Sequence, residues 1–170
     1  MYIQKKQQGF TLIELVVVIV ILGILAVTAA PKFIDLSADA DKAVLEAASG
    51  SLLSGAKLVY SKAIIQGVQN QELTDIDING DGTTDVEIKY GYPSADRTKG
   101  IANALDLGED WTYGDGSSGG RFLLTTSSLT GFSGITNNNL HITKTKCYLT
   151  YTAPTAVGVL PTVTYTTTGC

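Results

Sequence analysis

Oxygen-bearing side chains alternate along the stretch DINGDGTTD, residues 77–85. The residues that a calcium ion would use there are Asp77, Asn79, Asp81, Thr83 and Asp85. Their spacing matches the front of an EF-hand loop, with Gly82 at the sharp turn and Thr83 offering its carbonyl oxygen. An EF-hand ends on a bidentate Glu, where this chain has Ile88. The stretch therefore predicts a compact calcium turn that is not an EF-hand. The alternative is an Asn-Gly and Asp-Gly turn with solvated acids.

The chain has two cysteines, Cys147 and Cys170, both in its C-terminal part. A bond between them would stabilise the fold by roughly 3 kcal/mol in the chain-entropy model. Such a bond needs an oxidising compartment, a periplasm or the cell exterior. We expect the disulfide, and two free thiols are the alternative.

A single carboxylate, Glu14, lies near the start of an otherwise apolar segment, residues 10–30. As an α-helix this segment would be about 31 Å long, close to the hydrocarbon thickness of a bilayer. Lys5 and Lys6 precede it, and basic residues hold their end of a membrane segment in the cytoplasm. A secretory signal peptide has a shorter apolar core. A plain membrane anchor fits the length but leaves the buried charge of Glu14 unexplained.

Cleavage between Gly9 and Phe10 would give Glu14 a partner. The new α-amine of Phe10 is a cation, and Glu14 follows four residues later on the same helical face. The two charges would neutralise each other within one chain or between packed chains. Pairing between chains would also fix their axial register, because a buried charge without a partner is strongly destabilising.

The stretch KKQQGFTLIELVVVIVILGILAVTAAPKF, residues 5–33, resembles the N-terminus of a type IV prepilin. That family has a short basic leader ending in Gly, then Phe-Thr-Leu-Ile-Glu-Leu and an apolar helix. The resemblance implies cleavage after Gly9 by an inner-membrane prepilin peptidase, followed by N-methylation of Phe10. It also makes Glu14 an assembly residue, which in an incoming subunit meets the amine of Phe10 in a neighbour.

The patterning predicts an α+β fold, a long N-terminal α-helix packed against an antiparallel β-sheet head. The resemblance implies the lollipop fold of type IV pilins. We expect a cleaved leader (1–9), a hydrophobic transmembrane and assembly helix (10–30), an amphipathic helix (31–67) and a β-rich head (68–170). The head would hold the disulfide loop 147–170.

Apolar residues at spacings of three and four mark the amphipathic helix. They are Leu36, Ala40, Ala43, Val44, Ala47, Ala48, Leu53, Ala56, Val59, Tyr60, Ala63 and Ile64. Pro31 predicts a kink or a locally melted turn before them. Period-two alternation then predicts strands within residues 84–92, 119–128, 140–152 and 161–170.

The composition argues against several functions. The net charge is −4 and no cluster of basic residues occurs, so we expect no nucleic-acid partner. His141 is the one histidine, has no adjacent catalytic cysteine or serine, and is expected in a strand. Trp111 and Tyr113 could stack on a sugar, although core or loop anchors are the expected role. We therefore expect a protein that is not an enzyme and requires no cofactor.

Within the family, the apolar segment, the stretch DIDINGDGTTD and the late cysteine pair most resemble the mannose-sensitive haemagglutinin pilins. This implies a pilus subunit for adhesion and biofilm formation, first in the inner membrane and then on the surface of a Gram-negative bacterium. Its partners would be further copies in a helical filament, the prepilin peptidase and methylase, the assembly machinery, and host or abiotic surfaces including glycans. The alternatives are a pseudopilin of a type II secretion system and a monomeric, membrane-anchored sugar-binding protein.

Overall fold

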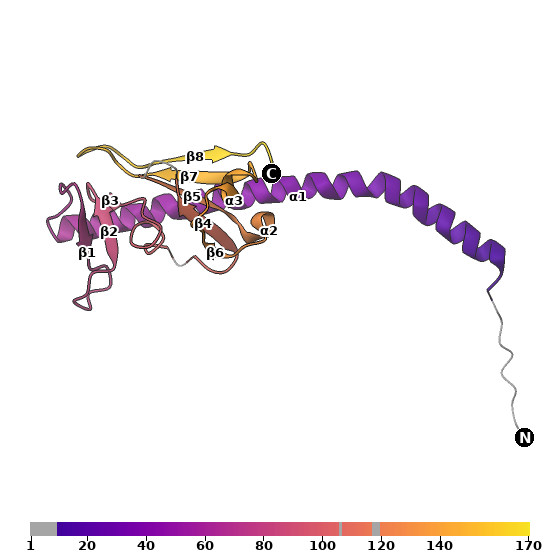
Figure 1. Ribbon diagram of the computed structural model, residues 1–170, viewed down its shortest axis with the longest axis horizontal. Helices are drawn as coiled ribbons and strands as arrows, with labels where there is room; N and C mark the ends of the chain where they lie inside the picture. The colour runs from indigo at the N-terminus through magenta and orange to yellow at the C-terminus, as the bar shows by residue number, and fades with distance from the viewer. Residues whose placement is uncertain (1–9, 106, 117–119) are drawn as a thin grey trace, which may run out of the picture. The chain divides into compact units, whose positions relative to one another are not determined.

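The computed structural model describes residues 10–105, 107–116 and 120–170. The chain divides into two compact units, residues 1–38 and 39–170, and the described strands all belong to the second (Figure 1). The architecture is α+β, as predicted. The leader, residues 1–9, lies outside the described residues.

The long helix α1 runs from Leu12 to Ile65. Pro31 lies within it, and no melted turn interrupts the helix as described. In the second unit, α1 buries one residue every three or four positions, which forms a single stripe. The buried residues are Leu45, Ser49, Leu52, Ala56, Val59 and Ala63.

The predicted stripe was partly wrong. It omitted Leu45 and Leu52, which are fully buried, and it included Leu36 and Val44, which are exposed. Apolar residues stand side by side at positions 44–45 and 52–53, so the spacing allows two neighbouring faces. Only packing against the sheets selects one of them.

A small antiparallel sheet contains β1 (Thr74–Ile76), β2 (Val86–Lys89) and β3 (Tyr92–Pro93), in that order. Val86 and Ile88 of β2 are buried while their neighbours are half-buried, which confirms the predicted alternation over residues 86–89. The strand predicted within 84–92 ends there, because Tyr90 and Gly91 form a turn. With Ile76 of β1 they pack against Val59 and Ala63 of α1. The end of the amphipathic helix therefore has its own sheet.

A second sheet contains β4 (Trp111–Asp115), β5 (Arg121–Thr126), β6 (Gly134–Ile135), β7 (Tyr148–Thr152) and β8 (Thr162–Thr166). The order is β6-β4-β5-β7-β8, antiparallel except for the parallel pair β4 and β6. Two short helices, α2 (Ser127–Thr130) and α3 (Leu140–Thr143), lie in its connections. The strands β1, β4 and β6 were not predicted.

The main core lies between α1 and the five-stranded sheet. It contains Leu45, Leu52, Ala56, Phe122, Leu124, Leu149 and Tyr151. The hydroxyl of Tyr151 donates a hydrogen bond to the carbonyl oxygen of Pro93 in β3, 2.8 Å away, so it links the two sheets. Burial raises the pKa of Tyr151 well above its usual value, and the neighbouring Tyr92 raises it further.

His141 lies in α3, so its predicted place in a strand was wrong. The backbone N–H of His141 donates to Asn138, and that of Thr143 donates to Asn139, which closes local helical turns. Lys146 then adopts a φ of 53°, and the strand begins only at Tyr148. The single strand predicted within residues 140–152 is therefore two elements, the short helix α3 followed by the strand β7.

The turn between β2 and β3 requires glycine at position 91. Gly91 has a φ of 85°, in the left-handed region that side chains disfavour. A Cβ atom there would lie 2.8 Å from the ring of Tyr60 and 2.9 Å from the carbonyl oxygen of Gln69. The Tyr60 ring cannot easily withdraw, because it stacks on Tyr92 with ring centroids 4.4 Å apart.

We predict that Gly91→Ala lowers the free energy of unfolding by about 2–4 kcal/mol, from backbone strain together with overpacking. Chemical denaturation of the purified chain measures this change. Gly108→Ala is the matched control, because nothing lies within 4 Å of a Cβ at that position and its φ is not positive. Equal stability of the two variants would contradict the close approach.

Candidate functional site

The first turn of α1 is closed by a capping box. Thr11 precedes the helix, and its backbone N–H and its Oγ1 donate to Oε2 of Glu14 at 2.8 Å and 2.7 Å. In return, the N–H of Glu14 donates to Oγ1 of Thr11 at 3.3 Å. This reciprocal pairing satisfies backbone donors that a helix start leaves open. The Thr-x-x-Glu spacing is the sequence signature of such a box, although the box was not predicted.

The assembly role of Glu14 stays a prediction. Phe10 is described and its side chain is 89% exposed, whereas Gly9 lies outside the described residues. In this chain Phe10 still follows Gly9, so its nitrogen is an amide and the predicted ammonium does not yet exist. Glu14 bonds instead within its own helix turn. Cleavage after Gly9 and methylation of Phe10 likewise stay predictions.

The segment Leu12–Ala29, which we call the stem, is the described helix that is long and apolar enough to cross a membrane. Its mean hydropathy is 3.0, and none of it is buried within the chain. Thr28 satisfies its hydroxyl inside the helix by donating to the carbonyl oxygens of Ile24 and Leu25. The stem therefore presents apolar surface on every side, which suits lipid or other apolar helices.

The predicted disulfide between Cys147 and Cys170 is present, with the Cα atoms 4.8 Å apart. Cys147 is fully buried, and Cys170 packs against the same core. The N–H of Gly169 also donates to the carbonyl oxygen of Lys146, 2.9 Å away. These contacts close the open end of the hairpin formed by β7 and β8.

The acidic loop 77–85 uses its side-chain oxygens for its own backbone. Asp77 accepts hydrogen bonds from the N–H groups of Gly80 and Gly82, at 2.6 Å and 2.9 Å. Asp85 accepts from the N–H groups of Ile78 and Asn79, at 2.9 Å and 3.3 Å. These bonds fix the loop without a cation.

The remaining oxygens of the loop are also engaged. Asp81 accepts hydrogen bonds from the hydroxyl and N–H of Thr83 and from the amide of Asn79, which hold its pKa below the usual range. Asn79 in turn accepts from the N–H of Asp81 at 2.8 Å. Among the described residues, no group of three or more His, Cys, Asp or Glu is placed to hold a metal ion. Calcium binding by the loop stays a prediction.

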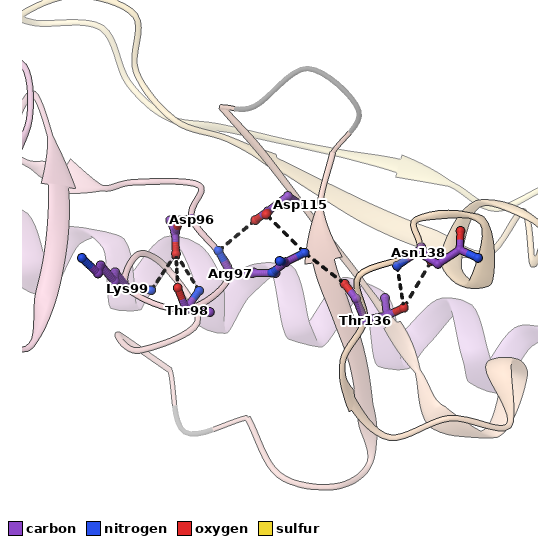
Figure 2. Close-up of polar contacts among 7 residues, drawn as sticks. All are labelled: Asp96, Arg97, Thr98, Lys99, Asp115, Thr136 and Asn138. Atoms are coloured by element: carbon purple, nitrogen blue, oxygen red, sulfur yellow. Dashed lines mark hydrogen bonds and ion pairs between the residues drawn. The ribbon is translucent and has the colours of Figure 1, made fainter.

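A polar cluster holds the segment 94–100 onto the larger sheet (Figure 2). The backbone N–H of Arg97 donates to Oδ1 of Asp115 at 2.9 Å, and its guanidinium lies 3.5 Å from Oδ2. The same guanidinium donates to the carbonyl oxygen of Thr136 at 3.4 Å. Arg97 therefore joins three segments that are distant in the sequence.

Asp96 closes the turn beside this cluster. Its Oδ1 accepts hydrogen bonds from the N–H and hydroxyl of Thr98 and from the N–H of Lys99, at 2.6–2.8 Å (Figure 2). Partial burial acts to raise the pKa of Asp96. The bonds from Thr98 and Lys99 and the charge of Arg97 outweigh it and leave the pKa below its usual value.

The aromatic and histidine candidates lie in separate places. Trp111 and Tyr113 in β4 are partly buried against the main core, which is the anchoring role we expected. The ring of Tyr113 packs on Phe122, with centroids 5.7 Å apart. His141 meets the edge of Phe132, with centroids 6.0 Å apart. No catalytic set was predicted, and the described positions of Trp111, Tyr113 and His141 do not bring them together with another candidate.

Comparison with known proteins gives consistent matches. Residues 4–30 match the family described as the prokaryotic N-terminal methylation motif. The chain is 43% identical over 61 residues to the type IV narrow pilus major component PilA5 of Thermus thermophilus. That match covers 36% of this chain and only 49% of the relative.

Longer matches reach two fimbrial proteins of Pseudomonas aeruginosa. Each is 32% identical over 131 residues, which covers 64% of this chain and 84% of the relative. No solved structure matches the chain.

We predict that Cys170→Ser lowers the free energy of unfolding by about 3 kcal/mol, because it opens the loop that the disulfide closes. Thermal denaturation under oxidising conditions measures the effect. Thr168→Ser, a small change two residues away, is the control. A melting temperature for Cys170→Ser equal to that of the control would show that the disulfide does not stabilise the fold.

Proposed function

The chain belongs to the type IV pilins, and on that premise we propose that it polymerises through its stem into a surface filament for adhesion and biofilm formation. The match with PilA5 spans about half of that relative, so the partners of the whole protein are part of this proposal.

The unburied stem carries the proposal. All of its large side chains are exposed within this chain, between 43% for Val16 and 81% for Leu12. Fully burying one such side chain stabilises by about 1.5–3 kcal/mol, so the stem cannot remain in water. Lipid can hold it before assembly, and a bundle of identical stems can replace the lipid afterwards. Small residues such as Gly23 and Ala26 allow helices in such a bundle to approach closely.

Processing of the N-terminus would change Glu14 from a helix cap into the partner of a positive charge. We propose cleavage between Gly9 and Phe10 by the prepilin peptidase, with N-methylation of Phe10 by the same machinery. The new ammonium of Phe10 then competes with Thr11 for the carboxylate of Glu14. Pairing with the ammonium of a neighbouring chain selects one axial register, because every other register leaves charges unpaired among apolar stems.

Within the type IV pilins, we propose that the chain is one of the mannose-sensitive haemagglutinin pilins. It rests on the resemblance of the stem, the acidic loop and the disulfide loop 147–170. The precursor would reside in the inner membrane of a Gram-negative bacterium, and the assembly machinery would move it into an extracellular pilus. The filament would then bind host or abiotic surfaces, including glycans. The matched relatives are a pilus component and fimbrial proteins, which favours a pilus over a pseudopilin, an anchored sugar-binding protein or an enzyme.

Calcium binding by the loop 77–85 is proposed on residue types and spacing. The ion would have to replace hydrogen bonds that Asp81 now accepts from Thr83. We therefore expect weak affinity, in the range of about 0.1–1 mM that is typical of extracellular modules.

We predict that millimolar calcium raises the melting temperature of the purified chain, whereas magnesium at the same concentration does not, because calcium tolerates irregular oxygen shells. Asp81→Asn should abolish the rise. Asp75→Asn removes an exposed acid outside the loop and should retain it. A rise that Asp81→Asn leaves intact would place any bound calcium elsewhere.

We predict that Glu14→Gln and Glu14→Ala both reduce the yield of filaments sheared from cells by at least about tenfold, since either change leaves the ammonium of Phe10 unpaired. Glutamine keeps the capping box with Thr11 and removes only the charge. The pair of variants therefore separates charge from capping.

Intact mass and N-terminal sequencing of the sheared wild-type protein complete the test. We expect a start at Phe10 with one added methyl group and a closed disulfide. A start at Met1, or no material released by shearing, would contradict the pilus. A normal yield from Glu14→Gln beside a low yield from Glu14→Ala would show that Glu14 acts as a cap and not as a charge partner.

A further inference from the structure

The connection between β7 and β8 ends in an exposed apolar tip, residues 156–160. Val157, Val159 and Leu160 are 56%, 43% and 67% exposed. Gly158 turns the chain between them with a φ of 79°. No charged side chain occurs from position 147 to position 170, so the hairpin itself is uncharged. On its inner side Leu160 lines a small pocket with Leu53 and Lys57 of α1.

A groove with an apolar part lies beside α2 and α3. It has a volume of about 530 Å³ and is lined by residues 129–132, 140–141 and 144–145. Phe132 and Leu140 in its wall are 40% and 54% exposed. The hydroxyls of Thr130 and Thr145 donate to backbone carbonyl oxygens of the same chain, so Leu129, Phe132 and Leu140 supply the apolar part of a mixed lining. Lys144 stands at its rim without an ion pair or side-chain hydrogen bond among the described residues.

The tip and the groove lie at opposite ends of the second unit. Figure 1 shows the β7–β8 connection at the end where β1 and β2 lie, and α2 and α3 toward the C-terminus at the other end. Copies of the unit that share one orientation and follow one another along α1 would bring the tip of one toward the groove of the next. Such a contact is heterologous, so it extends without closing, as a helical filament requires.

We propose that the tip of one copy seats in the α2–α3 groove of the next copy. This inference rests on the proposed function and names a second contact, in addition to the stem. Val157, Val159 and Leu160 supply the apolar surface, and Phe132 and Leu140 receive it.

Charge favours this choice of partner. The chain is net acidic, and all of its acidic residues precede Gly116, so copies repel one another wherever those acids meet. The tip has no charge, and no acidic residue lines the groove. Contact there avoids the like-charge juxtaposition that other pairs of surfaces would create.

The contact is too small to join free molecules. Three aliphatic side chains cannot bury the roughly 1,200 Å² that a stable complex of standard size needs. Stems in a bundle, however, would hold neighbouring units at an effective concentration of about a millimolar or more. The tip and groove then bind each other only within an assembled filament, where they strengthen the binding between neighbouring copies.

Cysteine cross-linking in filaments tests the proposal. The full chain carrying both Val157→Cys and Leu140→Cys is expressed in cells, sheared as filaments and oxidised. We expect a ladder of covalent oligomers on non-reducing gels, with mass spectrometry joining the peptides that contain positions 140 and 157. Val157→Cys alone and Leu140→Cys alone should give no covalent dimer, because two tips, or two grooves, would have to meet.

The outcomes separate this inference from the proposed function. Filaments from the double variant that yield no ladder would overturn the tip-and-groove contact and leave the filament intact as a conclusion. A covalent dimer from Val157→Cys alone would overturn it also. A wild-type strain that sheds no filaments would instead overturn the proposed function.

A charge placed on the tip gives a second test. Val157→Asp should lower the temperature at which sheared filaments dissociate, while the melting temperature of the second unit stays unchanged. Leu73→Asp is the matched control, because Leu73 is 57% exposed but belongs to neither tip nor groove. Val157→Asp filaments as stable as those of the control, but unable to attach to surfaces, would show that the tip binds a surface and not a second copy.

Discussion

The stripe of α1 from Leu45 to Ala63 is the constraint on which the second unit depends. Its first part supports the five-stranded sheet, and its last part supports β1–β3. None of the described strands pairs across the two sheets, so the shared helix is the main element that holds them together, assisted by the bond from Tyr151 to Pro93. The strands β1 and β2, which flank the acidic loop, pack on the last part of this face, and β7 of the disulfide hairpin packs on the first part. Their spacing along the second unit is therefore set by the rise of α1.

The sequence was most informative where a pattern is long and uninterrupted. The stem and the α+β class followed from such patterns, whereas the Cys147–Cys170 pair followed from the chain having two cysteines. The choice between Val44 and Leu45 could not, because both rows are apolar and only the sheets decide between them. The strand assigned through His141 failed because the backbone of Asn138 and Asn139 closes local turns that side-chain alternation does not reveal. The tip and the groove could not be predicted from the sequence either, because the exposure of a side chain depends on the folded structure.

The repulsion between the carboxylates of the acidic loop can be reduced in two ways, by a bound cation or by hydrogen bonds from the loop itself. The spacing of Asp77, Asp81 and Asp85 predicted either a calcium turn or a turn with solvated acids. In the structure their carboxylates collect N–H and hydroxyl donors instead, helped by Gly80 and Gly82, whose φ values of 85° and 90° turn those donors inward. A loop built in this way is ordered before any ion arrives. The two states would then differ by an exchange of ligands and not by folding.

The disulfide has a mechanical consequence for the edge of the larger sheet. Among the described strands β8 pairs with β7 alone, and the exposed edge of such a strand is a natural place for unzipping or for pairing with a foreign strand. Here the hairpin connection joins the two strands at one end and Cys147–Cys170 joins them at the other. The pair is a covalent ring, so traction on either end cannot peel β8 away one hydrogen bond at a time. While the disulfide is intact, β8 cannot fray from either end, and separating it from β7 requires the pairing to open between two fixed ends.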